Sequence, residues 1–525
     1  MKILLVAFSG LLMGLTTAPF SAFYLAWISL IPLWLFTILD DKNNPKITLK
    51  KFIFSQKTLI AFVWGFCYHG FALFWITGIH PMTWMGVPWL ASLFIAAFCW
   101  IFIAVWGAIL VTFWSILIRL FNLKNTNRLG FKNGLIKAIS RVIVGVAIWC
   151  LLELIWNQGA LWWTSLSYTQ SPNNLGILQL TKLSGYSTVT AAIVGVNGLI
   201  AESLILGQKK DKNKAQSLSL LITAILLFFN LHLLGFLLYN QPIITDKNQA
   251  IKVGIIQGNI PNTIKLYPEG WKKAIEGYTK GYETLASQKV DLVITPETAL
   301  PFDWNYIVNN SSFYPAILNK KVPVILGAFG SQGTSYTNSL LMITGTGKLL
   351  SRFDKVKLVP LGEYIPFENI LGKIINRLSP LDSHLAAGKP SQIFNTPFGQ
   401  AIIGICYESA FSEHFRRQAK AGGEFIITAS NNAHYSKIMP AQHHAQDIIR
   451  AIETDRWMAR ATNTGYSAII NPHGDTLWIS DINTYQLHQE TIYRRNTQTL
   501  YVKWGDWLTI ILCIISGFLV LFTNE

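Results

Sequence analysis

Long apolar runs divide this 525-residue chain into a membrane-like part and a polar part. A run of about 20 apolar residues is long enough for a helix to cross the hydrocarbon core of a bilayer. The pattern therefore predicts eight transmembrane helices, with a short break near Pro19 between the first two. The predicted spans are residues 3–18, 21–39, 58–79, 89–118, 142–157, 186–206, 218–238 and 506–522.

The pattern changes at residue 251, where short apolar runs rich in β-branched residues begin. Most of these runs end in a small or polar residue, and amphipathic stretches such as 271–289 and 441–461 separate several of them. Buried strands that alternate with helices predict an α/β domain. We therefore expect a helical membrane bundle over 1–239, an α/β domain over 240–504 and a final membrane helix over 505–525.

Basic residues gather in the segments 40–57, 119–141 and 207–217. The loops 80–88 and 158–185 are nearly free of them, with Lys182 as the exception. Positively charged loops stay in the cytoplasm. We therefore expect both termini in the cytoplasm and residues 240–505 on the opposite side of the membrane. The first 18 residues also resemble a cleavable signal peptide, but a retained helix agrees better with the second span that follows at once.

Composition supports a membrane protein and argues against nucleic-acid binding. The chain is 51% hydrophobic and only 13% charged, whereas soluble domains carry roughly 25% charged residues. Most of the net charge of +16 lies in the three basic segments. We interpret it as a topology signal, because a nucleic-acid site needs clustered phosphate contacts.

Cys406 is the only cysteine in the polar part of the chain, and it follows an apolar run in the motif GICYES. A lone thiol is either a small buried hydrophobe or a nucleophile. Glu297 in VITPETALP and Lys355 in RFDKVKLVP also lie at the ends of predicted strands. Side chains after such strands meet at one edge of a sheet. Taken singly, each of the three signals is weak.

The histidines of the polar part do not form a metal-binding pattern. His434, His443 and His444 have a spacing that fits no common zinc motif. The glycine-rich segment 327–333 lacks a phosphate-binding lysine. The sequence therefore predicts neither a metal nor a cofactor.

Five motifs in order resemble the apolipoprotein N-acyltransferases, the integral-membrane branch of the nitrilase or carbon–nitrogen hydrolase superfamily. They are QGNIP (257–261), TPETALP (295–301), DKVKLVPLGEYIPF (354–367), GICYES (404–409) and ATNTG (461–465). The resemblance covers essentially the whole chain. It implies a nitrilase-like αββα sandwich inserted before the last helix and a catalytic triad of Glu297, Lys355 and Cys406. It also implies supporting roles for Glu363, Tyr407 and Glu408.

The resemblance further implies a multi-pass protein of the bacterial inner membrane with its catalytic domain in the periplasm. A membrane phospholipid would donate an acyl chain to Cys406, and an apolipoprotein with a diacylglyceryl-modified N-terminal cysteine would accept it. In this chemistry Glu297 is the general base, which works best if burial raises its pKa towards neutrality. The Lys355 ammonium stabilises the oxyanion, and the thioester passes the acyl group to an amine.

Some features leave alternatives open. The apolar face of 368–381 fits either a membrane-facing lid or a packed surface helix. The aromatic residues of 156–168 suggest a belt at the membrane interface, and Glu153 and Glu202 lie in or near spans. The chain departs from the family at Leu266 or Tyr267, where a tryptophan is common, at Trp156, and at 434–436.

Two other functions compete with acyl transfer to an amine. A membrane-anchored amidase would use the same triad with water as acceptor, although such a hydrolase needs no multi-span bundle. A transporter or receptor with an outer ligand-binding domain would need no reactive thiol. The product, N-acylated protein or free fatty acid, discriminates the first alternative, and the reactivity of Cys406 discriminates the second.

Overall fold

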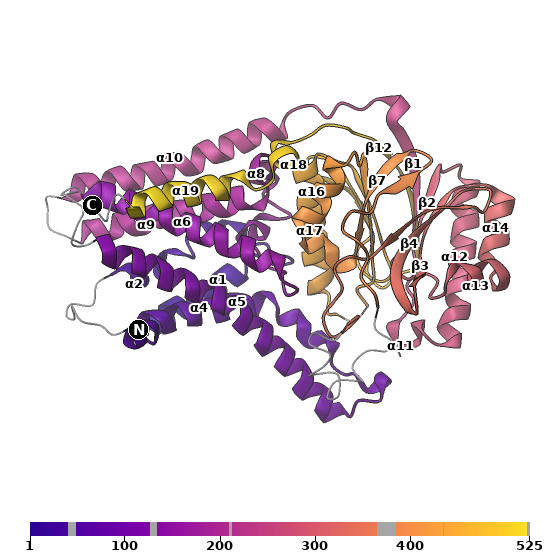
Figure 1. Ribbon diagram of the computed structural model, residues 1–525, viewed down its shortest axis with the longest axis horizontal. Helices are drawn as coiled ribbons and strands as arrows, with labels where there is room; N and C mark the ends of the chain where they lie inside the picture. Colours follow the sequence, from indigo (N-terminus) through magenta and orange to yellow (C-terminus); the bar gives the residue numbers. More distant parts are fainter. Residues whose placement is uncertain (40–48, 126–133, 209–212, 365–384, 434, 522–525) are drawn as a thin grey trace. The chain divides into compact units, whose positions relative to one another are not determined.

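The computed structural model describes residues 1–39, 49–125, 134–208, 213–364, 385–433 and 435–521. The chain forms two compact units (Figure 1). The first comprises Met1–Thr77, Ile95–Gln241 and Trp504–Glu525, and the second comprises Gly78–Phe94 and Pro242–Lys503.

The first unit is helical. Among the residues that the structure describes, four helices are long and apolar enough to cross a membrane: α5 (Trp89–Asn125), α6 (Gly134–Gln158), α9 (Tyr186–Gly207) and α10 (Lys214–Tyr239). Shorter helices accompany them: α1 (Lys2–Gly14), α2 (Ile31–Ile38), α3 (Leu49–Ile53), α4 (Gln56–Ala72), α7 (Leu175–Leu178), α8 (Thr181–Ser184) and α19 (Trp507–Leu521). The chain thus has a membrane-type helical part.

The segment 21–39 differs from the single span that its composition predicts. A 3-10 helix covers Phe23–Trp27, and α2 begins only at Ile31. Pro32 lies in the first turn of α2, where a missing backbone N–H costs little. A proline favours a helix start, so the apolar run breaks into two short elements.

A buried ion pair joins Arg141 to Glu202 in the first unit, although the sequence placed Arg141 in a loop. Arg141 lies within α6, and its Nε donates to Glu202 Oε1 of α9 at 2.8 Å. Trp34 Nε1 donates to the same carboxylate at 3.0 Å. Glu153 of α6 is also buried, and it accepts hydrogen bonds from Ser165, Thr190 and the Leu166 N–H. Both intramembrane acids therefore have a structural explanation.

The second unit contains two six-stranded sheets. The first has the order β12-β1-β2-β3-β4-β5 and the second the order β11-β10-β9-β8-β7-β6. The first sheet is built from β1 (Ala250–Gln257), β2 (Leu292–Ile294), β3 (Val324–Gln332), β4 (Ser335–Ile343), β5 (Leu349–Asp354) and β12 (Gln486–Tyr493). The second is built from β6 (Phe394–Thr396), β7 (Gly399–Ile405), β8 (Phe425–Ser430), β9 (Met458–Thr462), β10 (Ala468–Ile470) and β11 (Thr476–Ile479).

Helices cover the outer faces of the two sheets (Figure 1). On the first sheet these are α12 (Pro268–Ser287), α13 (Trp304–Asn310) and α14 (Phe313–Lys320), and on the second α16 (Ser412–Lys420) and α17 (Ile438–Thr454). Two short helices, α11 (Asn262–Lys265) and α18 (Leu500–Trp504), complete the unit. One buried cluster joins both sheets, including Val253 and Ile255 from β1 and Ile403 and Ile405 from β7. The apolar strand runs are therefore buried on both faces, which explains why they lack a polar side.

Strand direction brings the predicted site residues to strand ends. β1, β2 and β3 run parallel to one another, as do β7, β8 and β9. Glu297 follows β2, Lys355 follows β5 directly, and Cys406 follows β7 directly. The prediction of an α/β domain is confirmed, and the three candidate residues lie after strand ends.

Candidate active site

Lys355 and two carboxylates form a buried ion cluster. The Lys355 side chain is 1% exposed, and its Nζ donates to Glu297 Oε1 at 2.9 Å and to Glu363 Oε1 at 2.9 Å. Asn338, on β4, donates from Nδ2 to the same two oxygens at 2.7 and 3.0 Å. The cluster therefore fixes the Glu297 carboxylate between a charged and a neutral donor.

The second carboxylate oxygen of Glu297 accepts a hydrogen bond from the residue that follows β8 in the second sheet. The Asn431 backbone N–H, directly after β8, donates to Glu297 Oε2 at 2.8 Å. Thr298, the residue after Glu297, has a φ of 48°, in the left-handed region that non-glycine residues rarely adopt. The carboxylate is thus held at both oxygens, and its backbone turns sharply.

The electrostatics of this cluster correct one sequence-based expectation. Burial alone would raise the pKa of Glu297, but the adjacent Lys355, Lys265 and Asn338 outweigh it and lower the pKa below the ordinary value. Burial likewise opposes the charge of Lys355, but Glu297 and Glu363 raise its pKa well above the ordinary value. The condition under which a general base works best, a pKa raised by burial, is therefore not met at Glu297, because the charge partners prevail.

Cys406 starts a 3-10 turn over Cys406–Ala410, and its φ of 53° places it in the left-handed region. Burial, followed by the charge of Glu297, raises the pKa of the Cys406 thiol to about 12, although Lys355 and the Asn431 N–H act in the opposite direction. The charges of the ion cluster therefore act on the Cys406 thiol. At neutral pH the site holds a protonated thiol and an ionised carboxylate.

Glu408 links the turn that begins at Cys406 to the loop after Lys355. Its Oε1 accepts from the backbone N–H groups of Val356 at 2.6 Å and Lys357 at 3.1 Å, and its Oε2 accepts from the Ile405 N–H at 2.7 Å. His414 Nε2 lies 3.4 Å from Oε2. Burial alone would raise the pKa of Glu408, but His414 and these N–H donors lower it.

We expect Glu408→Gln to destabilise the full-length protein by about 2–4 kcal/mol, because the neutral amide replaces the carboxylate that three N–H groups share. Since the folded pKa of Glu408 lies below its ordinary value of 4.5, this stabilisation is present at neutral pH and is lost as the pH falls through the folded pKa. Thermal unfolding of the detergent-solubilised protein at pH 7 measures the change. The exposed Glu283→Gln is the matched control, and equal stability of the two variants would contradict the assignment.

The other supporting residues take separate positions. Glu363 accepts from Lys355 through one oxygen and from the Val359 N–H through the other at 2.8 Å. The Tyr407 ring packs edge-on against Phe411, with centroids 5.1 Å apart. Glu363 thus belongs to the ion cluster, whereas Tyr407 belongs to the turn that carries the thiol.

Three residues of the site, Lys265, Asn338 and Asn431, were not predicted from the sequence, and His443 was considered only as a metal ligand. His443 Nε2 bonds to the Cys406 carbonyl oxygen at 2.8 Å, and its Nδ1 lies 3.1 Å from Asn432 Nδ2. Burial, and then Arg460, lower the pKa of His443 well below the ordinary value. The imidazole is therefore neutral. Its Nδ1 accepts a hydrogen bond from Asn432 Nδ2, and its Nε2 donates to the Cys406 backbone carbonyl oxygen. Asn431 could have been predicted, because it directly follows a buried apolar strand, as the three candidate residues do.

The structure gives His443 and His444 hydrogen-bonding roles. His444 Nε2 bonds to Thr476 Oγ1 at 3.0 Å. Within the described ranges, no group of three or more His, Cys, Asp or Glu side chains is arranged to hold a metal ion. His434 and the apolar segment 368–381 lie outside the described residues. Burial, and then the charge of Cys406, raise the pKa of Tyr435. Tyr435 therefore interacts electrostatically with Cys406.

At the departure near residue 266, Leu266 directly follows α11, and Tyr267, which is 50% exposed, directly precedes α12.

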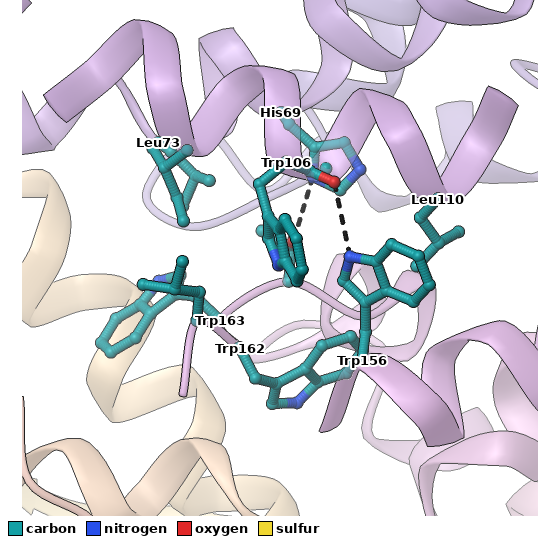
Figure 2. A pocket seen from close by; sticks show the side chains of 11 residues that line it. His69, Leu73, Trp106, Leu110, Trp156, Trp162 and Trp163 are labelled. Atoms are coloured by element: carbon teal, nitrogen blue, oxygen red, sulfur yellow. Dashed lines mark hydrogen bonds between the residues drawn. The ribbon is translucent and has the colours of Figure 1, made fainter. Parts of the chain in front are cut away.

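Two of the aromatic residues of 156–168 are buried in the protein, which differs from the exposed position expected in an interfacial belt. Trp162 and Trp163 are buried within the first unit, at 2% and 8% exposure. Figure 2 shows them with Trp106 and Trp156 around a small pocket, where Thr164 bonds to His69 and Trp156 donates to the Trp106 carbonyl. The pocket has a volume of about 20 Å³, which is room for about one water molecule.

Comparisons with known proteins agree with this geometry. Residues 252–499 match the carbon-nitrogen hydrolase family, and residues 9–199 match the apolipoprotein N-acyltransferase N-terminal domain. The chain is 54% identical over 507 residues to an apolipoprotein N-acyltransferase of a Nostoc species, a match that covers 96% of each chain. It is 50% identical to one of a Synechocystis species, with 96% of this chain and 97% of that one covered.

Among solved structures, the chain is similar to an amidase from a Nesterenkonia species, with a TM-score of 0.37 and 15% identity. That match covers 52% of this chain and 99% of the amidase. A nitrilase-superfamily member from Saccharomyces cerevisiae matches with a TM-score of 0.36 and 17% identity, over 49% of this chain and 94% of that chain.

The second unit therefore carries a carbon–nitrogen hydrolase domain, which covers residues 252–499. Most of the helical unit matches the apolipoprotein N-acyltransferase N-terminal domain, which points to one family within this class. With relatives at about half identity over nearly the whole length, the chain belongs to the apolipoprotein N-acyltransferase family. The resemblance that the five motifs predicted is confirmed.

Proposed function

We propose that this protein transfers an acyl chain from a membrane phospholipid to the α-amino group of the diacylglyceryl-modified N-terminal cysteine of an apolipoprotein. The observation that carries the proposal is the meeting of Glu297, Lys355 and Cys406 at strand ends, in a chain of this family. The reaction proceeds in two halves, with a thioester on Cys406 between them.

In the first half-reaction the Cys406 sulfur attacks the ester carbonyl of the phospholipid. Because the thiol has a pKa of about 12, its proton must leave as the carbon–sulfur bond forms, and Glu297 accepts it. An ammonium has three N–H groups. Glu297 and Glu363 take two of those on Lys355, and we assign the third to the oxyanion.

Collapse of the tetrahedral intermediate breaks the carbon–oxygen bond of the ester. The protonated Glu297 returns its proton to the departing alkoxide, so the lysophospholipid leaves as an alcohol and the acyl group remains on Cys406. In the second half-reaction the neutral amine of the acceptor attacks the thioester. Glu297 accepts the amine proton and passes it to the departing Cys406 thiolate, which restores the thiol and leaves an amide.

The proposed placement follows from the distribution of charge and apolar length. We assign eight spans, with both termini in the cytoplasm and residues 240–504 as a periplasmic catalytic domain before the last span over 505–525. The bacterial inner membrane supplies the phospholipid donor. Arg119 and Arg141 are helix residues that bond within the first unit, but the lysines of the basic segments support the same orientation.

The product of the reaction tests the proposal directly. The detergent-solubilised protein is incubated with a phospholipid that carries a labelled acyl chain and with a peptide that begins with diacylglyceryl-cysteine. We expect label in an amide at the peptide N-terminus, and none in the same peptide with its amine acetylated. Release of labelled fatty acid at equal rates with both peptides would instead favour an amidase-like hydrolase.

A further inference from the structure

The Gln257–Pro261 motif has no part in the chemistry above, yet it leads directly to a buried lysine. Lys265 is the last residue of α11, and it is 5% exposed. Its Nζ donates to the backbone carbonyl oxygen of Glu297 at 3.1 Å. Lysines are almost never fully buried unless a charged partner stabilises them. Lys265 therefore requires an explanation beyond packing.

An asparagine network fixes the start of α11 to the strand ends of the second sheet. The Asn463 side chain accepts from the Ile260 N–H at 2.9 Å and donates to the Ile260 carbonyl at 2.7 Å. Asn431 Nδ2 donates to Asn262 Oδ1 at 2.9 Å, while the Asn431 backbone N–H donates to Glu297. The segment that carries Lys265 is thus tied to the same residue that holds the Glu297 carboxylate.

The charges around Lys265 belong to the reacting groups. Burial lowers the pKa of Lys265 to about 8, and the charges of Glu297 and Cys406 act against that lowering. One neutral carbonyl does not offset the several kcal/mol that burying an ammonium costs. The Glu297 carboxylate supplies the remaining stabilisation. In return, Lys265 contributes to the low pKa of Glu297.

We infer that Lys265 is a second active-site lysine, a positioning residue that holds the Glu297 backbone and adds a positive charge beside its carboxylate. This inference rests on the proposed function, in which Glu297 must be ionised to accept the thiol proton. Because Lys265 lowers the pKa of Glu297, the carboxylate stays ionised, and can act as a base, at lower pH. The Gln257–Pro261 motif is the support that places it.

The test follows acylation of Cys406 in the full-length protein, in single turnover with a labelled phospholipid and without acceptor, between about pH 4 and 9. In Lys265→Met we expect acylation at pH 7 to slow by about 10–100-fold, since the carbonyl anchor is lost. The acid limb of the rate profile should move up by about one pH unit, because the Glu297 pKa rises when a neighbouring positive charge is removed. A purely structural role would lower the rate without moving that limb.

Two further variants separate the bond from the charge. Lys265→Gln retains a donor for the carbonyl but has no charge, so we expect a smaller loss of rate with the same shift of the acid limb. It also serves where Lys265→Met does not fold. Lys272→Met removes an exposed lysine of α12 and should match wild type. A wild-type acid limb in both Lys265 variants would overturn the inference alone, whereas a wild-type protein that never acylates Cys406 would overturn the proposed function itself.

Discussion

Replacing Cys406 by alanine is expected to reduce N-acylation of a diacylglyceryl peptide by about 1,000-fold or more, because the covalent intermediate can no longer form. The substitution removes a small side chain that is 7% exposed at a positive-φ turn, so the fold should persist. Steady-state transfer from a labelled phospholipid measures the loss. Thermal unfolding of the same preparation measures retention of the fold.

Two variants make this prediction specific. Cys406→Ser retains a nucleophilic atom of lower reactivity and should be nearly as inactive as Cys406→Ala. Cys513→Ala, in α19, removes a thiol from the helical unit and should transfer at the wild-type rate. Substantial activity in a folded Cys406→Ala protein would show that another group attacks the phospholipid.

Replacing Glu297 by glutamine is expected to slow acylation by about 10²–10⁴-fold, the usual contribution of a general base. The same change should make the Cys406 thiol more acidic. Burial raises the pKa of the thiol most and remains in the variant, but the charge of Glu297, which raises the pKa further, is gone. The variant therefore combines a more acidic thiol with slower transfer.

The two effects are separated by alkylating the protein with iodoacetamide across a pH series and quantifying the peptide that contains residue 406. Its alkylation midpoint should lie at lower pH in Glu297→Gln than in wild type. Glu283→Gln, an exposed glutamate of α12, is the control for both measurements. A variant that transfers acyl chains at the wild-type rate would exclude Glu297 as the base.

The sequence was informative wherever the chemistry follows a strand. Glu297, Lys355 and Cys406 each come within three residues of a strand end, and local apolar patterns locate such ends. The role of Asn338 could not be predicted from the sequence, because Asn338 lies inside β4 as one polar residue among several. The direction of the Glu297 pKa shift could not be predicted either, since it depends on Lys355, Lys265 and Asn338, which lie 58, 32 and 41 residues away in the chain.

The helical unit shows the same limit. Among the described residues, apolar length identified the four long helices α5, α6, α9 and α10, but not the break before Ile31 or the burial of Trp162 and Trp163. Arg141 looked like part of a basic loop because its partner, Glu202, is 61 residues further along the chain. Pairings of this kind are fixed by packing between helices, which no local pattern records.

The central claim is that the acyl group passes through a thioester on Cys406. The most direct measurement incubates the full-length protein with a labelled phospholipid in the absence of acceptor and maps the label by mass spectrometry. We expect one acyl group on the peptide that contains Cys406, cleaved by hydroxylamine, absent from Cys406→Ser and discharged when the diacylglyceryl peptide is added. Active protein that carries no acyl group on this peptide, or carries one that the acceptor does not remove, would contradict the mechanism.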